Sequence, residues 1–161
     1  MNGKYILSVA NEMALQFDRD PYIAASENGA IISFKDLGSL KGAFFSSLPK
    51  PAIVINDALD DTMKKIVCAH ELGHFILHKN RAFSCEKIDF SSKSISGKCE
   101  REANLFASAF LIDSQKVTDI LKNGYTVSQT ASLLNTDVNL LLFLLNSMGL
   151  TDAPDSSFLK R

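Results

Sequence analysis

The chain has 161 residues and a net charge of −1, and hydrophobic residues make up 46% of it. This apolar content is sufficient for a folded core and excludes a disordered chain, and the length is typical of one compact domain, with or without a small helical appendix. The charge shows no basic excess for nucleic acid, and the longest uninterrupted apolar stretch, residues 140–145, is too short to cross a membrane.

The N-terminal residues and the cysteines indicate the expected compartment. Residues 1–5 lack the long apolar run of a signal peptide. Cys68, Cys85 and Cys99 form an odd count without a disulfide spacing, which is typical of a reducing environment. We therefore expect a cytoplasmic protein with no membrane segment.

The first third of the chain predicts a helix and then a small sheet. Apolar residues four apart predict an amphipathic helix over 4–17, which we expect to pack across the sheet. Residues 18–21 end this helix. Strands are predicted over 30–34, 42–47 and 52–56, and their short intervals favour a mostly antiparallel sheet. We expect the strand over 52–56 to be an edge strand that holds an extended peptide by backbone hydrogen bonds.

A helix over about 58–78 follows, with Asn56 or Asp57 as its predicted cap. It contains the pattern His-Glu-x-x-His. His70 and His74 lie one turn apart on one face, so both imidazoles can point at one metal ion. Glu71 projects about 100° away, where its carboxylate can reach a water bound to that metal. This pattern is a zinc metalloprotease signature, in which zinc acidifies the water and the glutamate takes its proton.

An ordinary core helix is the alternative interpretation, because the two histidines share their face with three apolar residues, Met63, Val67 and Leu77. Three features favour the metal site. Glu71 stands next to the first histidine, and a carboxylate motif follows downstream. Gly73 lies inside the motif, where it costs helix stability but lets another backbone come close.

Residues 80–98 are rich in serine and basic residues and predict a loop. Both a loop that borders the cleft and a plain surface connection fit this composition.

A second helix, over 99–111, supplies the third candidate ligand. Two histidines and one glutamate form a catalytic zinc set that leaves a position for water. Glu100 and Glu102 lie about 200° apart on a helix, so only one of them can face the metal. We favour Glu100, because Asn104 lies one turn further on and can hydrogen-bond a ligand histidine. Glu102 is expected to pair with a surface cation.

The rest of the chain predicts helices over 113–123, 126–134 and 138–148. They resemble a helix-turn-helix module, but residues 124–150 contain no lysine or arginine, so DNA binding is not expected. We expect a metallopeptidase domain over 1–112 and a helical C-terminal subdomain over 113–161 that packs on it.

Two motifs together resemble the ImmA/IrrE metallopeptidases. They are the sequence HELGHFILH at 70–78 and the sequence EREANLFA at 100–107. The resemblance covers residues 42–111 well and the C-terminal helices loosely. It implies a zincin-like α+β fold with a small sheet, one zinc ion, and endopeptidase activity against few substrates, which are typically helix-turn-helix repressors or stress regulators. It also implies His70, His74 and Glu100 as zinc ligands and Glu71 as the general base, whereas His78 is not a usual ligand.

Two other functions compete with a zinc endopeptidase. A non-catalytic, zinc-containing regulator or toxin–antitoxin component would act by protein binding, although a structural zinc needs no base such as Glu71. A structural zinc held by His78, Cys85 and Cys99 would have cysteine ligands in its favour, but the spacing matches no zinc template.

Tyr22 and Tyr125 are candidates for stabilising an oxyanion, without positional support.

Overall fold

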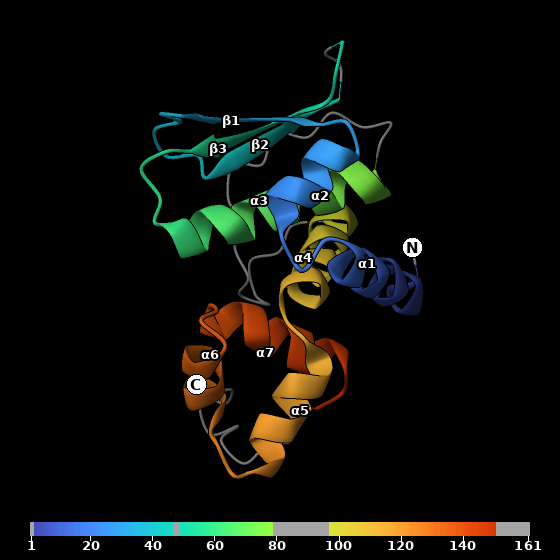
Figure 1. Ribbon diagram of the computed structural model, residues 1–161, viewed down its shortest axis with the longest axis vertical. Helices are drawn as coiled ribbons and strands as arrows, with labels where there is room; N and C mark the ends of the chain where they lie inside the picture. The colour runs from blue at the N-terminus through green and yellow to red at the C-terminus, as the bar shows by residue number, and fades with distance from the viewer. Residues whose placement is uncertain (1, 47–48, 79–96, 151–161) are drawn as a thin grey trace.

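The computed structural model describes residues 2–46, 49–78 and 97–150, and these contain seven helices and three strands. Figure 1 shows them in the chain order α1 (Gly3–Gln16), α2 (Pro21–Glu27), β1 (Ile31–Lys35), β2 (Gly42–Phe45), β3 (Ala52–Asn56), α3 (Asp61–Leu77), α4 (Lys98–Leu111), α5 (Ser114–Lys122), α6 (Val127–Leu133) and α7 (Val138–Ser147). The predicted α+β class is confirmed, and the predicted loop over 80–98 lies almost wholly outside the described residues.

The three strands form one mixed sheet in the order β1-β3-β2. β3 pairs antiparallel with β2 and parallel with β1. The expectation of a mostly antiparallel sheet is therefore corrected: β2 and β3 form a hairpin-like pair, while β1 joins the other side of β3 in the same direction. The expectation that the strand over 52–56 is an edge strand is wrong. Its run of apolar residues makes it the best strand to bury, and Ile53 and Ile55 are fully buried in the centre of the sheet.

Helices α2 and α3 cover one face of the sheet, and α4 lies beyond α3 (Figure 1). Helix α1 packs mainly on α4, so the expectation that it crosses the sheet is wrong. Helix α2 was missed by the sequence analysis, which treated residues 18–21 only as a break. The carboxylate of Asp20 accepts hydrogen bonds from the backbone N–H groups of Tyr22 and Ile23, and Pro21 occupies the first turn, where its missing N–H costs nothing.

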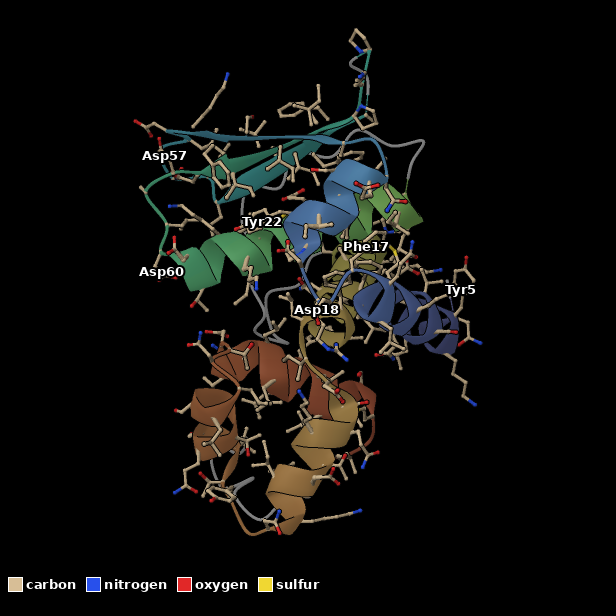
Figure 2. The ribbon with its side chains drawn as sticks, in the orientation of Figure 1. Tyr5, Phe17, Asp18, Tyr22, Asp57 and Asp60 are labelled. Atoms are coloured by element: carbon tan, nitrogen blue, oxygen red, sulfur yellow. The ribbon has the colours of Figure 1, made fainter. Side chains whose placement is uncertain are left out.

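Helix α3 is capped by Asp60, three or four residues after the two caps that the sequence suggested, Asp57 and Asn56. The side chain of Asp60 accepts a hydrogen bond from the N–H of Met63 (2.7 Å), and Figure 2 shows Asp60 at the start of the helix. Asn56 instead holds the preceding loop, because its side-chain amide donates to the carbonyls of Gly38 (3.0 Å) and Leu40 (2.8 Å). These two side chains fix the point at which the chain leaves the sheet and enters the motif helix.

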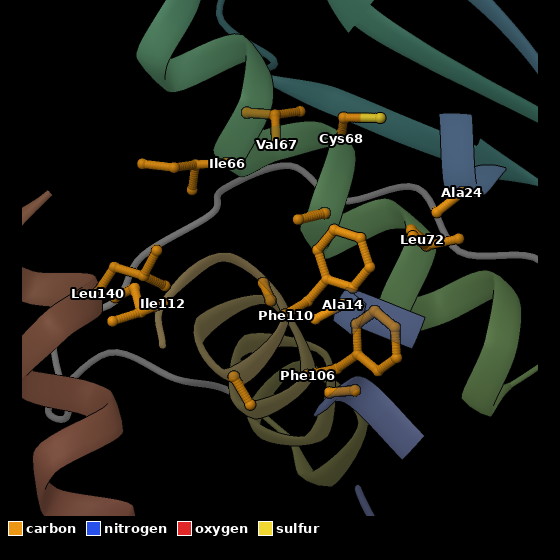
Figure 3. Close-up of a cluster of buried hydrophobic side chains, with 14 of the residues drawn as sticks. Ala14, Ala24, Ile66, Val67, Cys68, Leu72, Phe106, Phe110, Ile112 and Leu140 are labelled. Carbon is orange, nitrogen blue, oxygen red and sulfur yellow. The ribbon is translucent and has the colours of Figure 1, made fainter. Parts of the chain in front are cut away.

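The core centres on α4, which packs against α3, α1 and α7 (Figure 3). Phe106 and Phe110 of α4 are fully buried and stack with a centroid distance of 5.9 Å, and Leu72 and Leu140 pack against the same cluster from α3 and α7. The C-terminal helices begin at side-chain caps provided by Asp113, Thr126 and Asp137. Because α7 packs on α4, the C-terminal part of the chain supports the helix that carries Glu100.

Candidate metal centre

Helix α3 places two histidine side chains at the same buried point. His70 and His74 are four residues apart and wholly inaccessible to solvent. Their Nε2 atoms lie 3.1 Å from each other. Two imidazole nitrogens that face one another this closely suit a shared ligand between them, as the spacing predicted.

Helix α4 brings Glu100 to the same point. One carboxylate oxygen of Glu100, Oε2, lies 3.3 Å from Nε2 of His70, and the other, Oε1, lies 3.2 Å from Nε2 of His74. Burial by itself would raise the pKa of this carboxyl group, but hydrogen bonds and charge interactions with the two histidines lower it below its usual range. The structure thus brings together the three residues that the sequence singled out, His70, His74 and Glu100, and their donor atoms lie within 4.8 Å of one another.

Asn104 orients one of the two histidines, as the sequence predicted. Its side-chain oxygen lies 2.7 Å from Nδ1 of His70, and both groups are buried. An amide oxygen only accepts hydrogen bonds, so this contact places a ring proton on Nδ1 of His70 and fixes the orientation of the ring. Asn104 lies one turn beyond Glu100, so a single helix supplies both groups.

Glu71 lies beside this cluster in an unusual environment. It is fully buried, and neither of its carboxylate oxygens has a hydrogen-bond partner among the described residues. Its pKa is raised to about 8, mainly by burial, while a charge on His74 lowers the pKa and the charge on Glu100 adds to the rise. Burying a carboxyl group without a hydrogen-bond partner destabilises the fold, so its presence points to a function. One such function is to take up and release protons near neutral pH.

Gly42 lets β2 lie close to that carboxylate, which the sequence did not reveal. A side chain on this residue of β2 would collide with Val67 and would lie 3.3 Å from Oε1 of Glu71. The missing side chain therefore allows the first residue of β2 to pack tightly against α3 beside Glu71. A glycine at the start of an apolar strand was the only signal available in the sequence.

The glycine inside the motif lets the two helices approach closely, as predicted. A Cβ on Gly73 would lie 3.1 Å from both Cα and the carbonyl oxygen of Ala103, and 3.2 Å from Cβ of Phe106. Residues without large side chains on both helices allow this distance. The contact holds the first turn of α4, and so Glu100, against α3.

Several other expectations concern residues outside this cluster. Glu102 is buried rather than paired only with a surface cation: one carboxylate oxygen lies 3.5 Å from Nε2 of His78, and the other lies 4.0 Å from the exposed amine of Lys98. Tyr22, which is labelled in Figure 2, has its ring centroid 6.0 Å from that of Phe34 of β1, and Tyr125 is exposed beyond the end of α5, so no described contact joins either to the cluster. Cys85 lies outside the described residues, so the structure does not test it as a ligand.

The donors fit a divalent metal ion, and zinc in particular, because two imidazoles and one carboxylate form a known catalytic zinc set. Comparisons with known proteins agree with this geometry. Residues 25–140 match the model of the peptidase family M78, described as the IrrE N-terminal-like domain. The chain belongs to this family. The resemblance to the ImmA/IrrE metallopeptidases and the zincin-like α+β fold are thereby confirmed, whereas the role of each site residue stays a prediction.

Two curated proteins share part of this sequence. The metallopeptidase ImmA of Bacillus subtilis (strain 168) is 34% identical over 85 residues, which are 52% of this chain and 48% of ImmA. The uncharacterized immunity region protein 2 of Bacillus phage phi105 is 37% identical over 81 residues, 49% of each chain. The aligned part thus spans about half the length of these relatives. Among the described residues, no helix is both long and apolar enough to span a membrane.

Proposed function

We propose that this chain is a zinc-dependent endopeptidase that hydrolyses a peptide bond in a specific protein partner. The observation that carries the proposal is the position of Glu71. A fully buried carboxylate without a hydrogen-bond partner lies next to His70, His74 and Glu100, whose donor atoms converge. A metal site that only stabilised the fold would not need this group, whereas hydrolysis requires a base.

In this proposal His70, His74 and Glu100 would hold the zinc ion. When bound, zinc supplies Lewis acidity for the scissile carbonyl and lowers the pKa of a bound water. Glu71 takes a proton from the attacking water and then delivers it to the leaving nitrogen.

We propose β2 as the site where the substrate backbone binds, in place of the central strand over 52–56. β2 is an edge strand of the described sheet, because it pairs with β3 on one side only. It packs on α3, and its first residue, Gly42, lies beside Glu71. An extended segment that adds to this edge would bring its peptide bonds to the metal cluster. The C-terminal helices or the segment 80–98 would then select the partner.

A transcriptional regulator is the proposed class of partner. The support is the name of one relative, an immunity region protein of a bacteriophage, together with the similarity to the metallopeptidase ImmA. We propose a cytoplasmic location, where such regulators work.

The variant Glu71→Gln tests the proposal, because it separates zinc binding from cleavage. The change preserves the shape of the side chain and removes the base, so we expect the variant to bind one equivalent of zinc at the cluster and to lose cleavage by at least about 100-fold. The measurement is cleavage of candidate regulators encoded beside the gene, followed by mass spectrometry of the products. His74→Ala is the matched control that should lose both the zinc and the cleavage. Undiminished cleavage by Glu71→Gln would refute the assignment, and binding without cleavage by the wild type would indicate a regulator that acts by binding.

A further inference from the structure

A second group of metal-binding side chains lies one helical turn from the first. His78 is the C-cap residue that directly follows α3, and Cys99 and Glu102 lie in the first two turns of α4. Each offers one donor atom, and the three atoms lie within 4.8 Å of one another. None of these residues has a role in the proposed cleavage of a peptide bond.

The two facing helices explain why this second group exists. His78 follows His74 by four residues, so it lies one turn further along the same face of α3, with a centroid distance of 5.7 Å between the two rings. Cys99 and Glu102 are three residues apart and share a face of α4, while Glu100 between them points to the first group. The same pair of helices thus presents two sets of donors at successive turns.

Burial and charge at this second group resemble those of a binding site more than those of a surface ion pair. The side chains of His78 and Glu102 are only 7% and 9% exposed, and their nearest atoms, Nε2 and Oε2, are 3.5 Å apart. The amine of Lys98 lies 4.0 Å from the other oxygen of Glu102, but the Lys98 side chain is 70% exposed. An ion pair would account for His78 and Glu102, yet it would not account for a thiol at the same point.

The donor chemistry identifies the metal. A thiolate and an imidazole favour zinc over magnesium or calcium, and a carboxylate completes three positions of a tetrahedral shell. We propose that His78, Cys99 and Glu102 form a second zinc site, separate from the cluster of His70, His74 and Glu100.

This second site would tie the end of α3 to the beginning of α4. Glu100 lies between Cys99 and Glu102 in the sequence, so a metal ion that holds both neighbours fixes the helical turn that carries it. Binding to the folded chain also stabilises it by mass action. The second equivalent of metal should therefore raise the melting temperature of the chain, and it should do so even when the first cluster has been removed.

Titration of the metal-free full chain with Co²⁺ tests the proposal, because a cobalt–thiolate bond gives a charge-transfer band in the near ultraviolet and the first cluster contains no sulfur. We expect the wild type to bind two equivalents and to show this band. Cys99→Ser should bind one equivalent without the band, and the double variant His70→Ala/His74→Ala should bind one equivalent and retain it. Glu102→Gln, which preserves the shape of the side chain, should also lose the second equivalent.

Cys85→Ser is the matched control, and we expect it to keep both equivalents and the band. A wild type that binds one equivalent without the band would overturn the proposal, and this measurement needs no variant. A band that persists in Cys99→Ser would overturn it as well, because another cysteine would then be the ligand. Either result leaves the cleavage assay of Glu71→Gln unaffected, so the two proposals fail independently.

Discussion

At the scale of single residues, Glu71 is a fully buried carboxyl group without a hydrogen-bond partner among the described residues. Its carboxyl group has a pKa raised from 4.5 to about 8 by burial in the metal-free chain. A carboxyl group with a higher pKa in the folded than in the unfolded state stabilises the fold when protonated. This stabilisation is complete below about pH 4.5 and is lost as the pH rises toward 8. The lowered pKa of Glu100 acts in the opposite direction and only at acidic pH.

The metal-free chain should therefore become less stable than its Glu71→Gln variant as the pH rises from 5 to 7.5. The difference in the free energy of unfolding should grow by roughly 3 kcal/mol over this range, since each pH unit between the two pKa values costs about 1.4 kcal/mol. Urea denaturation of both proteins at a series of pH values, with a chelator present, measures it. A difference that stays constant with pH would show that Glu71 is ionised in the folded chain at low pH.

At the scale of the helices, the position of the metal cluster depends on how closely α3 and α4 approach. Gly73→Ala places a methyl group 3.1 Å from the backbone of Ala103, which is tighter than an ordinary contact. The cost of separating the helices exceeds the gain in helix propensity, so we expect a net destabilisation of about 1–2 kcal/mol. We also expect weaker zinc binding, because Glu100 would move away from the two histidines.

Gly3→Ala is the control for this change, since its added Cβ would make only an ordinary contact with Leu105, at 3.6 Å. Chemical denaturation and competition with a zinc chelator measure the two effects. Zinc binding by Gly73→Ala that equals that of Gly3→Ala would show that the close approach of the helices does not position the ligands.

The helices and strands also differ in how far the sequence could predict them. The motif helix, the pairing of His70 with His74 on one face, and the position of Asn104 relative to Glu100 all follow from spacing within single helices, which is a local property. The order of the strands is not local. Ala-Ile-Val-Ile at 52–55 identified a strand, but only its pairing with both β1 and β2 makes it central, and this depends on where the chain returns to the sheet. The position of α1 on α4 and the role of Gly42 beside Glu71 depend on tertiary packing in the same way.

At the scale of the whole molecule, the charge distribution argues against direct contact with DNA. The net charge is −1, and residues 124–150, which include α6 and α7, contain no lysine or arginine. Contacts to phosphates supply most of the affinity for duplex DNA, and these contacts require basic side chains. We therefore expect no binding to duplex DNA at physiological salt, as measured by fluorescence anisotropy. A tight complex whose affinity falls steeply with salt would contradict this expectation.

The central claim is that His70, His74 and Glu100 hold one zinc ion with Glu71 beside it, and the most direct measurement is an anomalous difference map at the zinc edge. It requires crystals of the full chain grown with one equivalent of zinc. We expect a peak at about 2.0–2.2 Å from Nε2 of both histidines and from a carboxylate oxygen of Glu100, with Glu71 outside the set of ligands. A first equivalent bound by Glu102 in place of Glu100, or a peak remote from His70 and His74, would contradict the account.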